Sequence, residues 1–182
     1  PAGKKIKMRL AIIDLGTNTC NLLIADAFEK KYEILYQGKE GVKLGKGGIH
    51  KNLLTQEAFD RAEAALKKHL RTISSFRAEE VITIATSAVR DAVNKNEFSD
   101  FLLKKTGLKL AVVSGEEEAT LIFKGVKLAF DQVPGHSLIL DIGGGSNELI
   151  IPVNNEIVWK QSFPLGMARV MGQFPISDPI NP

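Results

Sequence analysis

The chain has 182 residues, of which 44% are hydrophobic and 25% are charged, and its formal net charge is +3. This composition is typical of a globular protein with one good core or two modest ones, and it argues against disorder. No apolar run is long enough to span a bilayer, the basic N-terminal residues do not resemble a signal peptide, and the mild positive charge favours an anionic ligand, so we expect a cytoplasmic protein with no membrane or DNA partner.

The first predicted element is a strand over residues 10–13, which are continuous, apolar and bounded by turn residues. Asp14, Gly16, Thr17 and Asn18 follow it, and residues 21–26 predict a second strand. The pattern therefore indicates a strand-turn-strand hairpin. The only cysteine, Cys20, excludes an internal disulfide and a thiolate metal site, and we expect it in the core.

A third strand is predicted over residues 32–36, followed by a basic, glycine-rich segment over residues 38–51. Each lysine of this segment can be a solvated loop residue or can attract a polyanion. Residues 41–47 look like a Walker loop, but the spacing is short and no Ser or Thr follows the Lys. This segment is therefore predicted to be a loop.

The middle of the chain alternates between helices and strands, which indicates an α/β fold. Thr55 is the expected N-cap of a helix that extends to residue 75, and Gly107 is expected to end a second helix that starts at residue 96. A third helix is expected from residue 115 toward Phe130. The strands that precede these helices are predicted over residues 81–85 and 110–113.

Pro134 and Gly135 indicate a domain junction near residues 131–136, which divides the chain into domains 1–133 and 134–182. Beyond it, residues 137–140 predict a buried interior strand, and Asp141, three glycines and Ser146 follow. A dinucleotide fingerprint would need a helix next, but residues 147–152 are apolar and β-rich. A second hairpin is the better interpretation, so the domains look like duplicated halves.

Two matched loops of this kind indicate phosphate binding. Glycines let the backbone turn tightly, so that successive N–H groups and the Thr17 or Ser146 hydroxyl can face phosphate oxygens. A carboxylate beside such an anion site is repulsive alone, which implies a magnesium ion between them. The phosphate-binding residues expected on this basis are Gly16, Thr17, Asn18, Gly143, Gly144, Gly145 and Ser146.

Other polar residues occur at strand ends, where ligands of open α/β sheets bind, and we expect them to share one cleft. Residues 116–118 are three glutamates, of which only one is expected to face a ligand, because successive helical positions point about 100° apart. Ser114 and Glu117 have capping-box spacing, and the helix dipole alone can also explain all three carboxylates. Arg90 can bind phosphate or form a surface salt bridge, and Glu148 can reach a metal or lie exposed on its strand.

Four motifs, at residues 14–19, 86–91, 114–119 and 141–148, resemble those of the exopolyphosphatase and guanosine pentaphosphate phosphohydrolase (Ppx/GppA) family. Residues 42–55 and 164–169 also resemble segments of this family, so the resemblance covers essentially the whole chain. It implies the actin-like (ribonuclease H-like) α/β superfold, with duplicated domains, mixed sheets flanked by helices and a second domain that is incomplete here.

By this resemblance Glu118 matches the catalytic glutamate that deprotonates water, and Arg90 matches a phosphate-binding arginine. Asp141 and Glu148 match acidic residues that hold magnesium or assist the water, and Asp14 matches a residue of the first phosphate loop. The expected metal ligands are therefore Asp14, Asp141 and Glu148. Lys43 stands where many members carry Arg, which weakens bidentate phosphate contact slightly.

The resemblance implies a Mg²⁺-dependent hydrolase that releases a terminal phosphate from inorganic polyphosphate or guanosine pentaphosphate. A homodimer is the assembly expected of the full-length protein. The alternatives are a small-molecule kinase of the same superfold and a non-catalytic guanosine tetra- or pentaphosphate-binding regulator. Intact Arg90 and Glu118 favour the hydrolase. The lysine-bearing segment favours polyphosphate as the substrate.

Overall fold

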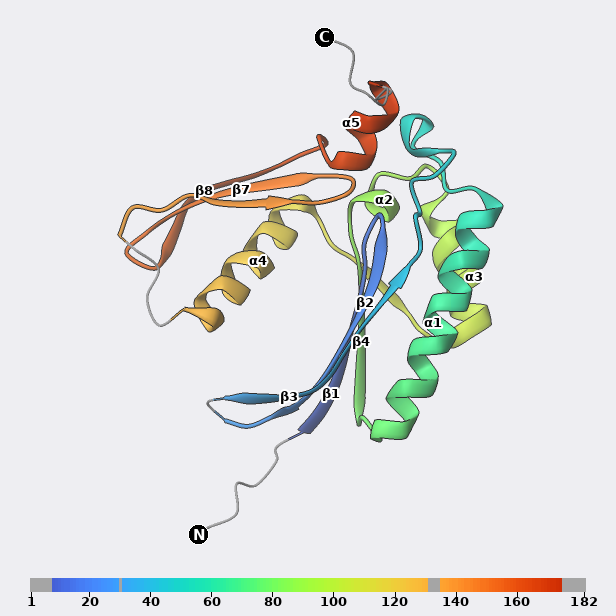
Figure 1. The fold of residues 1–182 in the computed structure, drawn as a ribbon, viewed down its shortest axis with the longest axis horizontal. Helices are drawn as coiled ribbons and strands as arrows, with labels where there is room; N and C mark the ends of the chain where they lie inside the picture. The colour runs from blue at the N-terminus through green and yellow to red at the C-terminus, as the bar shows by residue number, and fades with distance from the viewer. Residues whose placement is uncertain (1–7, 30, 131–134, 175–182) are drawn as a thin grey trace, which may run out of the picture.

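The computed structural model describes residues 8–29, 31–130 and 135–174. They form two sheets, a five-stranded mixed one of order β3-β2-β1-β4-β5 and a three-stranded antiparallel one of order β6-β7-β8 (Figure 1). The strands of the first sheet are β1 (Met8–Leu15), β2 (Thr19–Ala27), β3 (Tyr32–Gly41), β4 (Glu80–Ala85) and β5 (Leu110–Val112). Those of the second are β6 (Ile139–Ile142), β7 (Asn147–Val153) and β8 (Glu156–Phe163).

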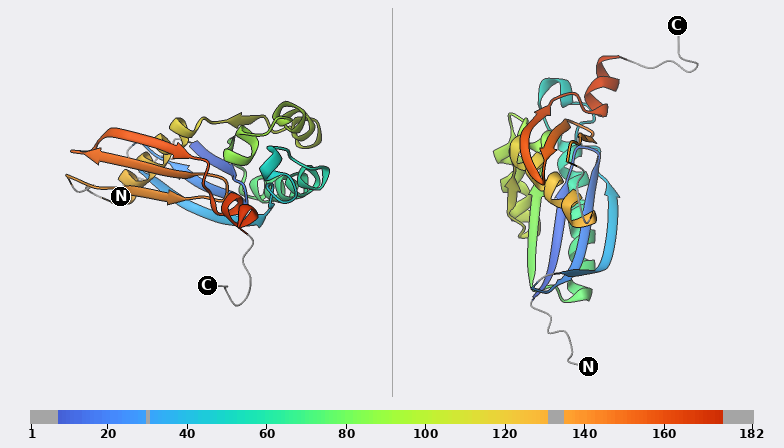
Figure 2. Two further views of the ribbon diagram at one scale, coloured as in Figure 1. Left: turned by 90° about the horizontal axis from the view of Figure 1, so that it is seen from above. Right: turned by 90° about the vertical axis from the view of Figure 1, so that its left-hand side faces the viewer.

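The helices connect and flank the sheets, as Figures 1 and 2 show. They are the 3-10 turn η1 (Ile49–Lys51) and the α-helices α1 (Gln56–Phe76), α2 (Ser87–Arg90), α3 (Lys95–Thr106), α4 (Gly115–Ala129) and α5 (Met167–Gln173). Helix α1 starts at the predicted cap, because the Thr55 side chain accepts a hydrogen bond from the Ala58 amide. Helix α3 ends at Gly107, whose φ of 74° suits glycine.

The main core lies between the first sheet and helices α1 and α3. Alternate β1 residues Ala11, Ile13 and Leu15 are fully buried there, and Phe59 and Phe98 pack edge to face with ring centroids 4.9 Å apart. The other face of this sheet is turned toward α4 and the second sheet (Figure 1). The core therefore fixes the strand ends from which the polar residues project.

The second sheet packs against α4 through a small cluster centred on Ala119, Phe123 and Ile150. Helix α4 falls within the predicted first domain, yet it contacts β7 and β8. Part of the predicted boundary, residues 131–134, lies outside the described residues. The domain division therefore stays a prediction.

Several predicted element boundaries were wrong. Strand β3 continues to Gly41, so the first part of the predicted loop 38–51 is strand. Strand β6 starts at Ile139 and is an edge strand instead of a buried interior one, with Leu140 52% and Ile142 62% exposed. Its outward face is bare because α4 covers only the other face of the sheet. The short helix α2 was not predicted.

A cleft between two phosphate loops

The two predicted hairpins are structurally equivalent. In both, the first loop glycine donates an amide hydrogen bond that closes the turn, from Gly16 to Thr19 O and from Gly143 to Ser146 O, each at 2.9 Å. Asp14 pairs with Asn21 across the first hairpin, and Asp141 pairs with Glu148 across the second. This register confirms the predicted duplication and corrects one detail, because the residue equivalent to Ser146 is Thr19 and not Thr17.

The two loops lie directly against each other. A Cβ atom added at Gly144 would lie 2.7 Å from Asn18 Nδ2, and one added at Gly145 would lie 2.5 Å from both Thr17 Oγ1 and Ser87 Oγ. Glycine is therefore required here for the approach of two lobes, and not only for a tight turn. The structure thus brings the predicted residues of both loops to one place.

Helix α5 orients the second loop. The amides of Gly166, Met167 and Ala168 donate to the carbonyl oxygens of Gly145, Gly143 and Gly144 at 3.3, 3.0 and 2.7 Å. In a trans peptide the N–H points opposite to the C=O, so the amides that follow these three carbonyls point away from α5. The loop therefore presents successive N–H donors on its free side, which is the arrangement that binds anions.

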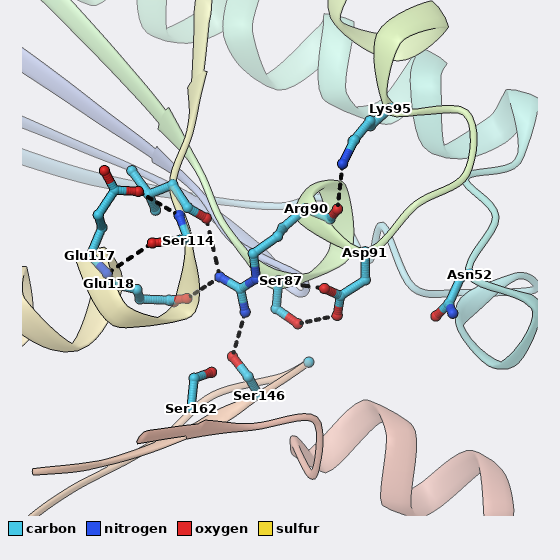
Figure 3. Close-up of polar contacts among 12 residues, drawn as sticks. Asn52, Ser87, Arg90, Asp91, Lys95, Ser114, Glu117, Glu118, Ser146 and Ser162 are labelled. Carbon is cyan, nitrogen blue, oxygen red and sulfur yellow. Dashed lines mark hydrogen bonds and ion pairs between the residues drawn. The ribbon is translucent and has the colours of Figure 1, made fainter. Parts of the chain in front are cut away.

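Arg90 and Glu118 meet beside the loops, as Figure 3 shows. Arg90, at the end of α2, donates from Nη1 to Glu118 Oε2 at 2.6 Å and from Nη2 to Ser146 Oγ at 3.5 Å. Glu118 is the third of the glutamates at the start of α4, and its side chain is 16% exposed. The structure therefore selects Glu118 as the glutamate that meets Arg90 beside the second loop.

The other two glutamates have different surroundings. Glu117 completes the predicted capping box, accepting from the Ser114 amide at 2.7 Å while its own amide donates to Ser114 Oγ at 3.1 Å. These bonds lower the pKa of the Glu117 carboxyl. The backbone oxygen of Glu116 accepts from Lys160 Nζ at 2.9 Å. Glu117 therefore has the structural role that its spacing predicts.

Acidic groups surround the Arg90–Glu118 pair. Burial raises the pKa of Glu118, the hydrogen bond from Arg90 opposes this rise, and the charges of Glu148 and Asp14 add to it. Burial also raises the pKa of Asp14, and the charge of Asp141 contributes. The charges of Glu148 and Asp14 thus act on Glu118, and the charge of Asp141 acts on Asp14.

Glu148 is 1% exposed, so the alternative of a solvent-exposed strand residue was wrong. Its Oε1 accepts a 2.6 Å hydrogen bond from Ser162 Oγ of β8. Ser162 also packs against the start of α4, since a Cβ atom added at Gly115 would lie 2.5 Å from Ser162 Cβ. The second sheet therefore holds Glu148 in a fixed position near the start of α4.

Sequence reasoning missed several residues of the cleft. Asp91 lies beside Arg90, and its Oδ2 accepts from Arg169 Nη2 at 2.6 Å and from Ser87 Oγ at 3.4 Å. Both Asp91 and Arg169 belong to segments that resemble motifs of a known family, and this resemblance was the only feature of the sequence that pointed to them. No feature of the sequence pointed to Ser162, because its contact with Glu148 depends on the pairing of β7 with β8.

A basic cavity of about 770 Å³ borders the first loop. Asn18 and Thr19 line it on one side and Ala168 and Gly172 of α5 on another. Its charged or titratable lining residues are all basic: Lys43, Lys46, His50 and Lys51. The lysine-bearing segment thus adjoins the loops, and this position suits an anionic ligand.

Among the described residues, neither a metal-binding cluster nor a membrane-spanning helix is found. Within residues 8–29, 31–130 and 135–174, no three His, Cys, Asp or Glu side chains form a group that could hold a metal ion by themselves. None of the helices described is both long and apolar enough to cross a membrane.

Comparison with known proteins is consistent with this geometry. The sequence profile of the Ppx/GppA phosphatase family matches residues 23–182. Exopolyphosphatase 1 of Mycobacterium leprae is 32% identical over 94% of the chain, and a bifunctional 3-dehydroquinate synthase/phosphatase of Fusobacterium nucleatum is 37% identical over 90%. The crystal structure of an exopolyphosphatase from Cytophaga hutchinsonii superposes with a TM-score of 0.91, at 43% identity over 95% of the chain.

The likeness confirms the predicted actin-like α/β class with its flanked sheets. The chain spans 51% of the Mycobacterium leprae protein, 26% of the Fusobacterium nucleatum protein and 55% of the Cytophaga hutchinsonii chain. The family profile matches from residue 23 onward, so its match includes the second loop, Arg90 and Glu118 and begins after the first loop.

Proposed function

Because the chain belongs to the Ppx/GppA phosphatase family, we propose that its protein hydrolyses the terminal phosphoanhydride bond of inorganic polyphosphate. The observation that carries the proposal is the 2.6 Å pair of Arg90 and Glu118 beside two facing phosphate loops. We assign phosphate binding to the Arg90 guanidinium of this pair and the role of base to the Glu118 carboxylate. Two matched proteins that carry the name exopolyphosphatase support the same reaction.

In this proposal the loops and Arg90 bind the phosphoryl groups. The amides that follow the carbonyls of Gly143, Gly144 and Gly145 donate to phosphate oxygens, and Thr19 and Ser146 supply matched hydroxyls. Arg90 supplies a planar fork of donors, which fits phosphate better than a lysine does. Fixed donors of this kind stabilise charge that develops in the transition state, which is the main requirement of phosphoryl transfer.

Glu118 acts as the general base. Its carboxylate accepts a proton from water, and the water oxygen then attacks the terminal phosphorus in line with the departing phosphate. Burial raises the pKa of Glu118 and so makes its carboxylate a stronger base, while the hydrogen bond from Arg90 opposes this rise by favouring the ionised form. A positioned base of this kind contributes about 10²- to 10⁴-fold.

Magnesium is part of the proposal, and Asp14, Asp141 and Glu148 are the residues that would hold it. The mutual repulsion of Asp14 and Asp141 fits a site for a cation, as does the hydrogen bond that orients Glu148. Mg²⁺ usually takes one or two carboxylates together with substrate phosphates, so a site of three protein ligands is not required. When bound, the ion would neutralise negative charge on the phosphates.

The basic cavity supports polyphosphate over guanosine pentaphosphate. Four basic side chains around about 770 Å³ suit several phosphates in a row, whereas no Phe, Tyr or Trp side chain lines the cavity to stack on a guanine ring. Long polyanions gain more from such a surface than short ones do. We therefore place in this cavity the phosphates of the polyphosphate substrate that are not cleaved.

The experiment is to incubate the full-length protein with long-chain polyphosphate, guanosine pentaphosphate or ATP, with and without Mg²⁺, and to measure orthophosphate. We expect Mg²⁺-dependent release that is fastest from polyphosphate. Release from pentaphosphate alone would overturn the substrate assignment but leave the hydrolase. Binding without release would indicate a regulator, and transfer from ATP to a small molecule would indicate a kinase.

A further inference from the structure

Arg169 of α5 joins the second lobe to the first through four acceptors. Its Nε donates to Gly145 O at 2.9 Å, and Nη1 donates to Ile49 O at 3.3 Å and to Asn52 Oδ1 at 3.1 Å. Its Nη2 donates to Asp91 Oδ2 at 2.6 Å. The side chain is only 14% exposed, so a single guanidinium ties the second phosphate loop to η1 and α2.

Asp91 lies between two arginines. Its Oδ2 binds Arg169. Its Oδ1 lies 3.5 Å from Nε of Arg90, and Figure 3 shows these two neighbouring side chains. Arg90 meanwhile directs its Nη1 and Nη2 donors at Glu118 and Ser146. The short contact of Asp91 is thus with Arg169, and the long one is with Arg90.

The ion pair with Arg169 affects how strongly Asp91 attracts Arg90. A carboxylate adjacent to Arg90 competes with a substrate phosphate for the same guanidinium, because both are anions that accept from its fork. The charge of Arg169 neutralises Asp91 and removes most of that competition. Arg90 is the other ion-pair partner of Asp91 among the described residues, so Asp91 would face Arg90 if Arg169 were absent.

We propose that Arg169 is a positioning residue for the phosphate site, which keeps Asp91 occupied so that Arg90 stays directed at the cleft, while it holds the second loop by Gly145 O. The inference rests on the proposed hydrolysis. It adds to that function a role for a pair of residues that touch neither the water nor the cleaved bond.

The test compares the full-length wild type with Arg169→Met, Asp91→Asn and the double variant, measuring kcat and KM for phosphate release from polyphosphate. Arg169→Met is expected to lower kcat/KM by about 10²-fold, as misplacement of a binding group by about 1 Å does. Asp91→Asn is expected to stay within about threefold of wild type, because the amide leaves Arg90 free. The double variant is expected to recover about tenfold over Arg169→Met.

Recovery of kcat/KM in the double variant separates a positioning role from a purely structural one. If both residues were only structural, the losses of activity in the two single variants would add. A double variant equal to or worse than Arg169→Met would overturn the inference, and so would an unchanged Arg169→Met or an inactive Asp91→Asn. Arg9→Met is the matched control, because Arg9 also binds a carboxylate and a backbone oxygen, Asp26 and Phe76 O, but at the far end of β1. If Arg169→Met fails to fold, Asp91→Asn still tests the inference. An inactive wild type would instead refute the proposed function.

Discussion

Arg90 Nη1 lies 2.6 Å from Glu118 Oε2, which joins the arginine proposed to bind phosphate to the proposed base in one ion pair. The two residues come from the ends of different elements, α2 and α4, that are 28 positions apart in the sequence. The pair is partly buried, with side chains 18% and 16% exposed, and so is shielded from salt. A bound phosphate would share the guanidinium with Glu118 and stand beside the water that this carboxylate activates.

Substitution of Arg90 by Lys should reduce turnover strongly. Lysine keeps the charge but cannot donate to Glu118, Ser146 and a phosphate with a planar fork. We expect kcat/KM for polyphosphate to fall by about 10²- to 10³-fold, the usual cost of losing a transition-state donor. Arg9→Lys is the control, since Arg9 lies far from the cleft, and equal activity of Arg90→Lys and wild type would refute the role of Arg90.

Substitution of Gly166 by Ala should displace the second loop. The backbone angles of Gly166, φ −65° and ψ 157°, suit any residue, but an added Cβ atom would lie 2.4 Å from backbone atoms of Gly145. We expect phosphate release to fall by about 10²-fold or more with a lowered melting temperature. Gly125→Ala is the matched control, because nothing lies within 4 Å of a Cβ atom there, and it should stabilise α4 by about 0.5–1 kcal/mol. Normal activity of Gly166→Ala would show that the packing of α5 does not fix the loop.

Neutralising the basic cavity should affect long substrates selectively. Lys46→Ala combined with Lys51→Ala is expected to raise KM for long-chain polyphosphate by roughly 2- to 30-fold, given the range of exposed charge interactions. KM for tripolyphosphate should change less, because a short chain places fewer phosphates in the cavity. The control is Lys104→Ala with Lys105→Ala on α3, which removes the same charge elsewhere. Equal increases for both chain lengths would contradict the assignment of the cavity.

Cys20 should be inert in the native protein. Burial raises the pKa of its thiol from 9.0 to about 12, and neighbouring carboxylates add to the rise. At pH 8 iodoacetamide should therefore modify the thiol only after unfolding. The unfolded state releases its thiol proton first as pH rises, so the free energy of unfolding should fall between pH 9 and 12. This decline should be smaller in Cys20→Ala, and rapid native modification at pH 8 would contradict the burial of Cys20.

Local sequence patterns were enough to predict most elements. Thr55, Ser114 and Gly107 marked helix ends correctly because capping depends on a few neighbouring residues. The glycines and aspartates of both hairpins also marked the loops, since a tight turn has a local requirement. Strand β6 was predicted as buried because its residues are apolar, but burial depends on what covers the strand.

The missed site residues depend on tertiary contacts. Asp91 and Arg169 are 78 positions apart, and no local pattern indicates that their side chains meet. Ser162 contacts Glu148 only because β8 pairs with β7 in one register. The equivalence of Thr19 with Ser146 could have been found by counting from the loop glycine and not from the hydroxyl residues. The roles of the predicted site residues, the magnesium ion, the cytoplasmic location and the homodimer stay predictions.

The most direct measurement compares Glu118→Gln with wild type in the full-length protein, for binding of polyphosphate in the presence of Mg²⁺ and for release of orthophosphate. Glutamine keeps the shape of the side chain and its contact with Arg90 but cannot accept a proton from water. We expect affinity for polyphosphate to stay within a few-fold of wild type and release to fall by about 10²- to 10⁴-fold. Release at the wild-type rate would contradict the account, because the carboxylate beside Arg90 would then not be the base.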